Sequence, residues 1–110
     1  MIDLSIVIVN WNVRDLLHRC LHSILATCNL QLATLQIIVV DNGSTDGSVA
    51  MIQAEFPEVH VIANTENRGF PAANNQGIAV AQGRYVLLLN PDTEVVGDAL
   101  ATLVAFTIAG

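Results

Sequence analysis

Short apolar runs rich in β-branched residues alternate with segments of helical spacing along the whole chain, and this alternation is the strongest constraint on the fold. Unbroken runs of this kind are typical of strands that are buried on both faces of a sheet. The predicted strands lie at residues 4–9, 36–40, 59–63 and 85–89. Because parallel strands need a crossover between them, usually a helix, the sequence predicts an α/β fold with a parallel sheet and helices on both faces.

Helical spacing follows each of these predicted strands. The predicted helices lie at residues 16–25, 49–56, 71–83 and 97–108. Asn12 with Asp15 resembles a capping box ahead of the first helix, Pro57 closes the second, and Pro71 suits the first turn of the third, which ends near Gly83. The last helix is apolar on all sides, which is typical of a buried helix. We therefore expect the chain to be the N-terminal part of a longer protein.

The composition narrows the classes of partner. The 110 residues carry 4 basic and 10 acidic side chains, which gives a formal net charge of −6. Nucleic-acid binding and a basic membrane-surface helix both require clustered Lys and Arg, so neither is expected. Apolar residues make up 53% of the chain and charged residues 13%, a composition that excludes disorder and indicates one domain or a piece of one.

Two absences in the sequence predict the location of the protein, and the spacing of its two cysteines agrees with that prediction. No apolar run reaches the ~20 residues that cross a bilayer, and Asp3 stands where a secretory signal would carry positive charge. The predicted location is the cytoplasm, and the longer protein could act at the inner face of the membrane. Cys20 and Cys28 lie eight residues apart, and if the first helix continues to Cys28 they are about 12 Å apart along its axis, which is too far for a disulfide.

Polar side chains follow every predicted strand at its carboxyl end. They are Asn10, Trp11 and Asn12 after the first strand, Asp41 and Asn42 after the second, Asn64, Asn67 and Arg68 after the third, and Asn90 and Asp92 after the fourth. In open α/β sheets, ligands bind outside the carboxyl ends of the strands, at the point where the strand order reverses. The sequence therefore predicts a binding site along this edge of the sheet.

Two carboxylates stand out at this edge. Asp41 could be an ordinary turn or capping residue. Ser44 and Asp46 are better placed to cap, however, so we expect the Asp41 carboxylate to be free to contact a base or a ribose. Asp92 follows a buried strand and Pro91, where a carboxylate suits Mg²⁺ or Mn²⁺. A cap or turn role for Asp92 is an equally open interpretation.

The segment before the third helix has the features of an anion site. Gly69 leads into the helix, whose free N–H groups can face a phosphate, and Arg68 adds a full charge. A solvated loop arginine is the alternative. Asn74 and Asn75 lie one turn into that helix, where Asn is unfavourable by propensity, so a packing or ligand role is expected.

Three common site motifs are absent. No G-x-G-x-x-G follows the first strand, and no G-x-x-x-x-G-K-[ST] occurs, so neither a dinucleotide fingerprint nor a P-loop is present. His18, His22 and His60 do not have the spacing of a zinc site.

Four segments taken together resemble the start of a family 2 glycosyltransferase, an enzyme of GT-A fold that uses nucleotide-sugar donors. They are SIVIVNWN at 5–12, VVDNGSTDGS at 39–48, NRGFPAANNQGI at 67–78 and YVLLLNPDTEV at 85–95. The pattern is most similar to the rhamnosyltransferase-like branch of bacterial surface polysaccharide synthesis. The resemblance implies that residues 1–110 form the Rossmann-like, nucleotide-sugar-binding half of a GT-A domain, with the acceptor-binding half absent.

The resemblance also implies roles for single residues. Asp41 would contact the base, normally uracil or thymine, so that the donor is UDP- or TDP-linked. Asp92 would bind a divalent cation, Mn or Mg, although Asn90 stands at the first carboxylate of the family's Asp-x-Asp motif and Asn42 stands where many relatives carry a second Asp. The residues expected to bind the nucleotide sugar are Asn10, Trp11, Asn12, Asp41, Asn67, Arg68, Gly69, Asn74, Asn75 and Asn90.

The implied reaction is transfer of a sugar, with inversion, to a hydroxyl of a saccharide or lipid-linked acceptor. The general base of this family lies beyond residue 110, so no catalytic residue is expected here and the chain alone should be inactive. The apolar face that truncation leaves open predicts self-association.

Other classes remain open at this point. They are a nucleotidyltransferase-like domain, which would want a basic Gly-rich loop after the first strand, a receiver-like module with Asp41 as phosphoacceptor, which would want a lysine, and an interaction domain without catalysis. The chain has neither that loop nor any lysine.

Overall fold

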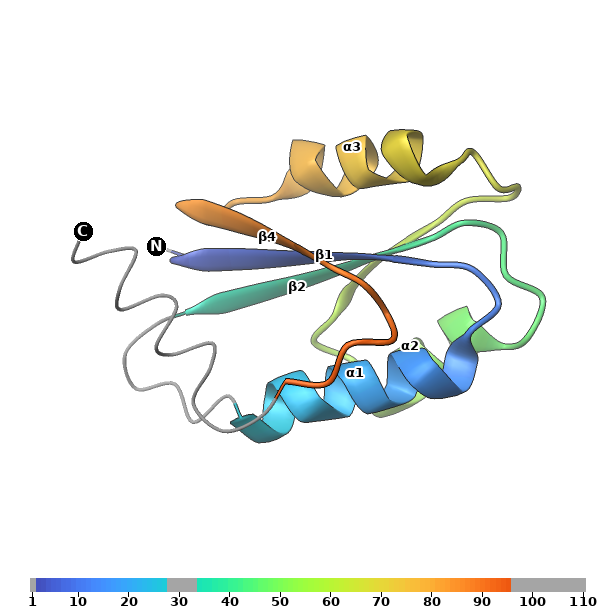
Figure 1. The fold of residues 1–110 in the computed structure, drawn as a ribbon, viewed down its shortest axis with the longest axis horizontal. Helices are drawn as coiled ribbons and strands as arrows, with labels where there is room; N and C mark the ends of the chain where they lie inside the picture. Colours follow the sequence, from blue (N-terminus) through green and yellow to red (C-terminus); the bar gives the residue numbers. More distant parts are fainter. Residues whose placement is uncertain (1, 28–33, 96–110) are drawn as a thin grey trace.

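The computed structural model describes residues 2–27 and 34–95 of the chain. Its elements are β1 (Leu4–Asn10), α1 (Arg14–Thr27), β2 (Leu35–Asp41), α2 (Ser48–Glu55), β3 (His60–Ala63), α3 (Phe70–Val80) and β4 (Tyr85–Leu89). Strands and helices alternate along the chain, as the apolar pattern predicts (Figure 1).

The four strands form one parallel sheet in the order β3-β2-β1-β4. The chain first moves outward from β1 through β2 to β3, and then returns to place β4 on the other side of β1. The strand order therefore reverses between β1 and β4. Because all strands are parallel, their carboxyl ends share one edge, with Asn10 paired to Asp41, and Ile8 to Leu89.

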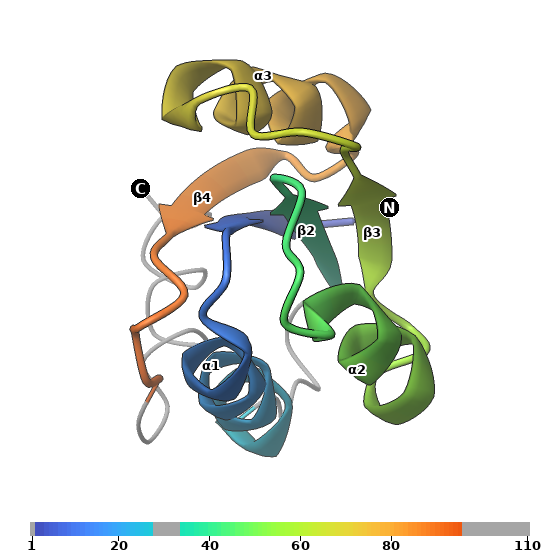
Figure 2. The same cartoon turned by 90° about the vertical axis from the view of Figure 1, so that its right-hand side faces the viewer.

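Helices cover both faces of the sheet. Figure 2 looks onto the carboxyl ends of the strands, with α3 above the sheet and α1 and α2 below it. On the lower face Ile6 and Ile8 of β1 pack with Leu17 and Leu21 of α1. On the upper face the core is smaller, and its buried residues are Val7, Val9, Ile38, Val40 and Ala73. The predicted α/β fold with helices on both faces is confirmed.

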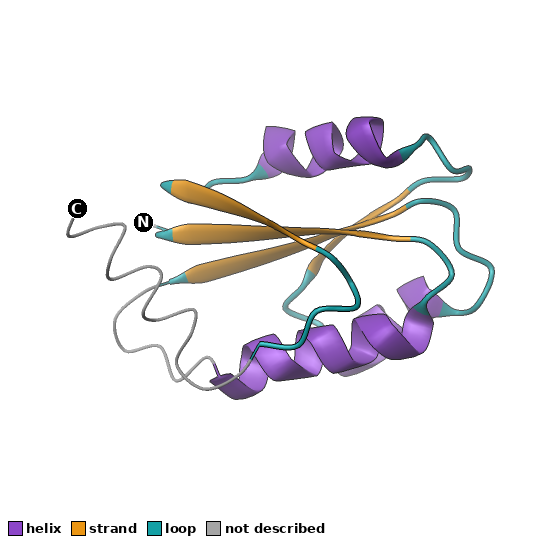
Figure 3. Cartoon of the chain, viewed as in Figure 1, coloured by secondary structure: helices purple, strands orange, loops and turns teal. Residues whose placement is uncertain are grey.

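The element boundaries differ slightly from the predicted ones. β1 and β2 each include their polar last residue, because Asn10 and Asp41 still pair in the ladder. α3 ends at Val80, not near Gly83, because Ala81 is extended and leads the chain to the start of β4. There the backbone N–H of Gly83 donates to Ser5 Oγ at 2.8 Å. Figure 3 shows the loop that makes this connection.

Two predicted features lie outside the described residues, namely the last helix at 97–108 and Cys28. Cys20 is a free, buried cysteine. Within residues 2–27 and 34–95, no helix combines the length and the apolar character needed to cross a bilayer. The cytoplasmic location stays a prediction.

The prediction that Asn12 caps α1 is wrong. Asn12 has a positive φ of 53°, and its Oδ1 accepts a hydrogen bond from the backbone N–H of Thr45 at 2.8 Å. The first-turn N–H of Arg14 donates instead to Asp46 Oδ2 at 2.9 Å. A carboxylate from the β2–α2 loop therefore caps α1, an interaction that depends on tertiary structure.

Close packing of α3 on the sheet depends on Gly77. A Cβ atom at this position would lie 2.4 Å from Val7 Cγ1 and 3.3 Å from Val40 Cγ2, and both valines are fully buried. We expect Gly77→Ala to lower the free energy of unfolding by about 2 kcal/mol, because this clash outweighs the better helix propensity of Ala. Urea unfolding measures the difference.

The control for this substitution is Asn75→Ala, at an exposed position of the same helix. It should keep or slightly raise the stability, because Ala has the higher helix propensity. A Gly77→Ala variant as stable as the natural protein would show that α3 does not pack this closely.

Asp46 is the second residue whose role in the fold can be tested. Burial raises its pKa, but hydrogen bonds from Ser48 and from the backbone N–H of Arg14 lower it more, so the pKa lies below the ordinary 3.8. A lowered pKa stabilises the fold at pH values above 3.8, and this contribution is lost as pH falls through the folded-state value.

We therefore expect the stability advantage of the natural protein over Asp46→Asn to be constant near neutral pH and to shrink below pH 3.8. Urea unfolding of both proteins between neutral pH and strongly acidic pH measures it. A stability difference that does not change with pH would contradict this role of Asp46.

Candidate functional site

Buried polar side chains collect at the carboxyl edge of the sheet. The buried polar residues of the described part are Ser5, Asn10, Asp41, Asn42, Ser48, Asn64 and Asn74. Only Ser5 lies near the opposite edge. Burying a polar group costs free energy unless it is hydrogen-bonded, so this edge is held by a specific hydrogen-bond network.

Asp41 forms the centre of the first part of this network. Its Oδ1 accepts from Asn10 Nδ2 at 2.9 Å and from Ser44 Oγ at 2.7 Å, and its Oδ2 accepts from the Ser44 N–H at 2.8 Å. Asp41 is only 1% exposed. The expectation that Ser44 acts as a cap and leaves Asp41 free is therefore wrong, because Ser44 itself bonds both carboxylate oxygens.

Asn10 retains one unused group. Its Nδ2 donates to Asp41 and, at 3.3 Å, to Ser44 Oγ, while its Oδ1 has no hydrogen-bond partner. It is the one buried side-chain oxygen or nitrogen in the described residues without a partner. An acceptor in this position, at the end of the central strand, is available to a donor group of a ligand or to water.

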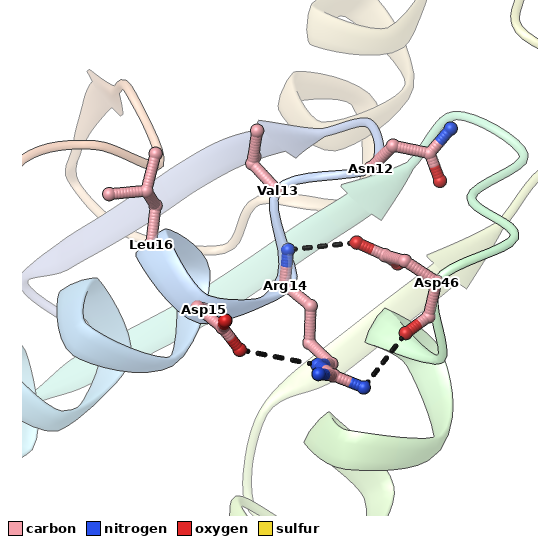
Figure 4. A pocket seen from close by; sticks show the side chains of 6 residues that line it. All are labelled: Asn12, Val13, Arg14, Asp15, Leu16 and Asp46. Carbon is pink, nitrogen blue, oxygen red and sulfur yellow. Dashed lines mark hydrogen bonds and ion pairs between the residues drawn. The ribbon is translucent and has the colours of Figure 1, made fainter.

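A surface hollow of about 280 Å³ lies where the β1–α1 loop meets the β2–α2 loop. It is lined by Asn12, Val13, Arg14, Asp15, Leu16 and Asp46 (Figure 4). The Arg14 guanidinium contacts Asp15 Oδ1 at 3.3 Å and donates to the Asp46 carbonyl at 3.1 Å. The positive charge is already paired here, so the hollow does not have the free cation that a phosphate site needs.

The second part of the network joins β2 to the loop before α3. Asn42 Oδ1 accepts from the Arg68 N–H at 3.1 Å, and Asn42 Nδ2 donates to the Gly69 carbonyl at 3.2 Å. Gly43, at φ +84°, lies so close to the backbone of Glu66 that a Cβ atom would approach it to 3.0 Å. The loop that carries Arg68 is therefore fixed to the tip of β2.

Asn64 and Gln76 extend this network to β3 and α3. Asn64 Nδ2 donates to Gln76 Oε1 at 2.8 Å, and Gln76 Nε2 donates back to Asn64 Oδ1 at 2.9 Å. Asn64 Nδ2 also donates to Asn42 Oδ1 at 3.2 Å. The sequence gives no local sign of the role of Gln76, because Gln is an ordinary helix residue and its partner lies twelve residues away.

The other predicted nucleotide-sugar residues line the same edge. Trp11 is 54% exposed beside the end of β1. Arg68 is exposed and forms no ion pair with the residues that the structure describes. Asn74 is buried, and Asn75 is exposed on the next position of α3. Asn67 Oδ1 accepts from the Gly69 N–H at 2.8 Å and so shapes the turn that enters α3.

Asn90 and Asp92 follow β4 at the carboxyl edge, on the face of the sheet that α1 covers. After β4 the chain turns towards α1, and the Val95 N–H donates to Ser23 Oγ at 2.9 Å (Figure 2). Burial, and next the charge of Asp92, raise the pKa of the Cys20 thiol to about 11. The structure thus places the Arg68 loop by α3 and Asp92 by α1, with the end of β1 between them.

The donor set at Asn90 and Asp92 fits a hard cation that takes most of its ligands from elsewhere. Both side chains are exposed and offer oxygen atoms. The described residues contain no group of three or more His, Cys, Asp or Glu side chains that could hold a metal alone. Mg²⁺ characteristically uses one or two carboxylates together with substrate phosphates and water, and this arrangement allows that mode.

Residues 5–109 match the sequence profile of the family described as Glycosyl transferase family 2. The chain is 34% identical over 103 residues to the succinoglycan biosynthesis protein ExoO of Rhizobium meliloti, which covers 93% of this chain and 29% of that protein. It is 36% identical over 101 residues to the poly(ribitol-phosphate) beta-glucosyltransferase of Bacillus spizizenii, which covers 88% of this chain and 16% of that protein. The chain spans less than a third of the length of these relatives.

Two solved structures have the same fold. S. aureus TarS 1-349 in complex with UDP superposes with a TM-score of 0.87 at 22% identity, covering 98% of this chain and 32% of that one. The mannosyltransferase PcManGT from Pyrobaculum calidifontis, in complex with GDP-Man and Mn²⁺, gives a TM-score of 0.78 at 24% identity, covering 92% and 30%. The GT-A architecture expected from the resemblance is confirmed, whereas the rhamnosyltransferase-like branch stays a prediction. The chain belongs to glycosyl transferase family 2.

Proposed function

We propose that this chain binds the nucleoside diphosphate of a nucleotide-sugar donor at the carboxyl edge of the sheet. The whole protein then transfers the sugar, with inversion, to an acceptor hydroxyl in cell-surface polysaccharide synthesis. One observation carries the proposal: the buried polar network of Asn10, Asp41 and Asn42 lies beside the reversal of strand order between β1 and β4. That is the crevice in which open α/β sheets bind ligands.

The nucleoside is proposed to lie over the ends of β1 and β2. Trp11 offers an exposed aromatic face for stacking on a base, and Asn10 Oδ1 is an unused acceptor. A carboxylate has about four acceptor positions, and the chain itself uses three of those of Asp41. Because Asp41 is only 1% exposed, its remaining acceptor position is closed to a ligand, and Asp41 serves as the anchor of this edge. Asn12 follows Trp11 in the β1–α1 loop and is proposed to line the same part of the site.

The diphosphate is proposed to lie between the Arg68 loop and Asp92. The Arg68 guanidinium supplies positive charge, and the first turn of α3 supplies N–H groups. Asn67, Gly69, Asn74 and Asn75 shape that wall. Asp92, with Asn90, would hold Mn²⁺ or Mg²⁺. A bound divalent cation supplies Lewis-acid stabilisation of the leaving diphosphate. The ligands of the similar structures, UDP for TarS and GDP-Man with Mn²⁺ for PcManGT, support a donor of this class.

The acceptor and the general base are proposed to belong to a part of the protein beyond these 110 residues, and residues 1–110 to form only the donor half. The names of the relatives, succinoglycan synthesis and poly(ribitol-phosphate) glucosylation, support a saccharide or polymer acceptor. Sugar transfer by this chain alone would contradict the proposal. Self-association through the apolar face that truncation leaves open stays a prediction. Val86 and Leu88 of β4 are exposed apolar side chains.

The proposal is tested by titrating the protein with UDP, TDP and GDP, each with and without Mn²⁺. We expect one of the three to bind in a saturable manner and more tightly with Mn²⁺, because a cation held by Asp92 would offset the negative charge of the diphosphate. Isothermal titration calorimetry measures each Kd. A protein that binds none of the three under either condition would contradict the proposed function.

The proposed role of Asp92 as a metal ligand is tested with Asp92→Asn. The matched control is Asp15→Asn, at an exposed position of α1. Asp92→Asn should weaken binding in Mn²⁺ about tenfold or more and leave binding without metal unchanged, because it removes a metal ligand. Asp15→Asn should change neither. Full Mn²⁺ dependence in Asp92→Asn would exclude Asp92 as the ligand.

A further inference from the structure

Three side-chain amides form a chain of defined direction from α3 to the tip of β2. Gln76 and Asn64 exchange two hydrogen bonds, and the remaining proton of Asn64 Nδ2 goes to Asn42 Oδ1 at 3.2 Å. An amide donates only through its nitrogen and accepts only through its oxygen. The Arg68 N–H and the Gly69 carbonyl fix the two ends of the Asn42 amide, so Asn64 must turn its nitrogen to Asn42. The two bonds from Gln76 then hold the Asn64 side chain in place.

The Asn42 amide holds the backbone on both sides of the Arg68–Gly69 peptide bond. Its oxygen accepts from the Arg68 N–H, and its nitrogen donates to the Gly69 carbonyl. Asn42 is 2% exposed, and both ends of its amide are already bonded. It can therefore affect a ligand only through the loop that it holds.

Arg68 is the basic side chain that this loop presents at the carboxyl edge. The chain has four basic residues, and all of them are arginines. Arg14 is paired with Asp15 and bonded to the Asp46 carbonyl, Arg19 is on α1, and Arg84 precedes β4 at the opposite edge. The attraction between two charges falls with distance, so the position of the Arg68 backbone determines what its guanidinium contributes to phosphate binding.

We propose that Asn42, held in place by Asn64 and Gln76, is a positioning residue that places the Arg68 guanidinium against the phosphates of the donor. The inference rests on the proposed function. It adds that a buried amide chain reaching back to α3 determines the recognition of phosphate, whereas recognition of the base is independent of that chain.

The test is a double-mutant cycle between Gln76→Leu and Arg68→Gln in the full natural chain. Calorimetry gives the Kd for UDP, TDP and GDP and for the nucleosides uridine, thymidine and guanosine. For the diphosphate that binds, we expect Gln76→Leu to weaken binding about fivefold and Arg68→Gln about tenfold. Nucleoside binding should not change. The double variant should bind like Arg68→Gln alone, because Gln76 acts through Arg68.

Matched controls are Gln53→Leu on α2 and Arg84→Gln before β4, both at exposed positions, and both should leave every Kd unchanged. A second variant covers the case in which Gln76→Leu does not fold. Asn42→Asp keeps the shape but replaces the donor that faces the Gly69 carbonyl with an acceptor. Protonation of the introduced carboxyl group restores a donor at this position. As the pH is lowered from 8 to 5, the diphosphate Kd of Asn42→Asp should therefore approach that of the natural protein at the same pH.

Additive effects of Gln76→Leu and Arg68→Gln, or an equal loss of nucleoside binding, would overturn the positioning role and leave the proposed function standing. A ratio of diphosphate Kd values between Asn42→Asp and the natural protein that does not change with pH would also overturn it. A natural protein that binds no diphosphate would overturn the proposed function and, with it, this inference.

Discussion

The hydrogen bond between the Asn10 amide and the Asp41 carboxylate is the interaction on which the functional edge depends. A buried carboxylate is costly unless it is hydrogen-bonded, and Asn10 and Ser44 supply the donors that offset this cost. The bond joins the ends of the two central strands, and it continues the ladder one residue beyond the apolar runs. This anchor places the next residue, Asn42, so that its side-chain amide holds the Arg68 loop.

Much of the fold could be predicted from the sequence, because it depends on local pattern. β4 has the predicted limits, and the order of strands and helices is as expected wherever the structure describes the chain. The errors lie where tertiary contacts decide. Asp46 caps α1 in place of Asn12. Gly83, expected near the end of the third helix, instead donates its N–H to Ser5, which is far away in the sequence. No local pattern reports a partner that is tens of residues distant.

The site could be predicted as a location but not as a set of contacts. Parallel strands bring their carboxyl ends together, so Asn10, Asp41 and Arg68 had to share an edge. Which side chains remain free depends on hydrogen bonds that the sequence does not reveal. Asp41 is nearly inaccessible, which also argues against the receiver-like alternative, since a phosphoacceptor must meet its phosphate donor. Gln76 completes the network without any local signal.

The central claim is that a nucleoside diphosphate binds at the carboxyl edge of this sheet, and backbone amide NMR tests it most directly. As the diphosphate is added with Mg²⁺, the account predicts that the largest chemical-shift changes occur at Asn12, Ser44 and Gly69. The amides of Ser5, Gln36 and Gly83, at the opposite edge, should not shift. Saturable changes centred on Ser5 and Gly83, or no saturable change at Gly69, would contradict the account.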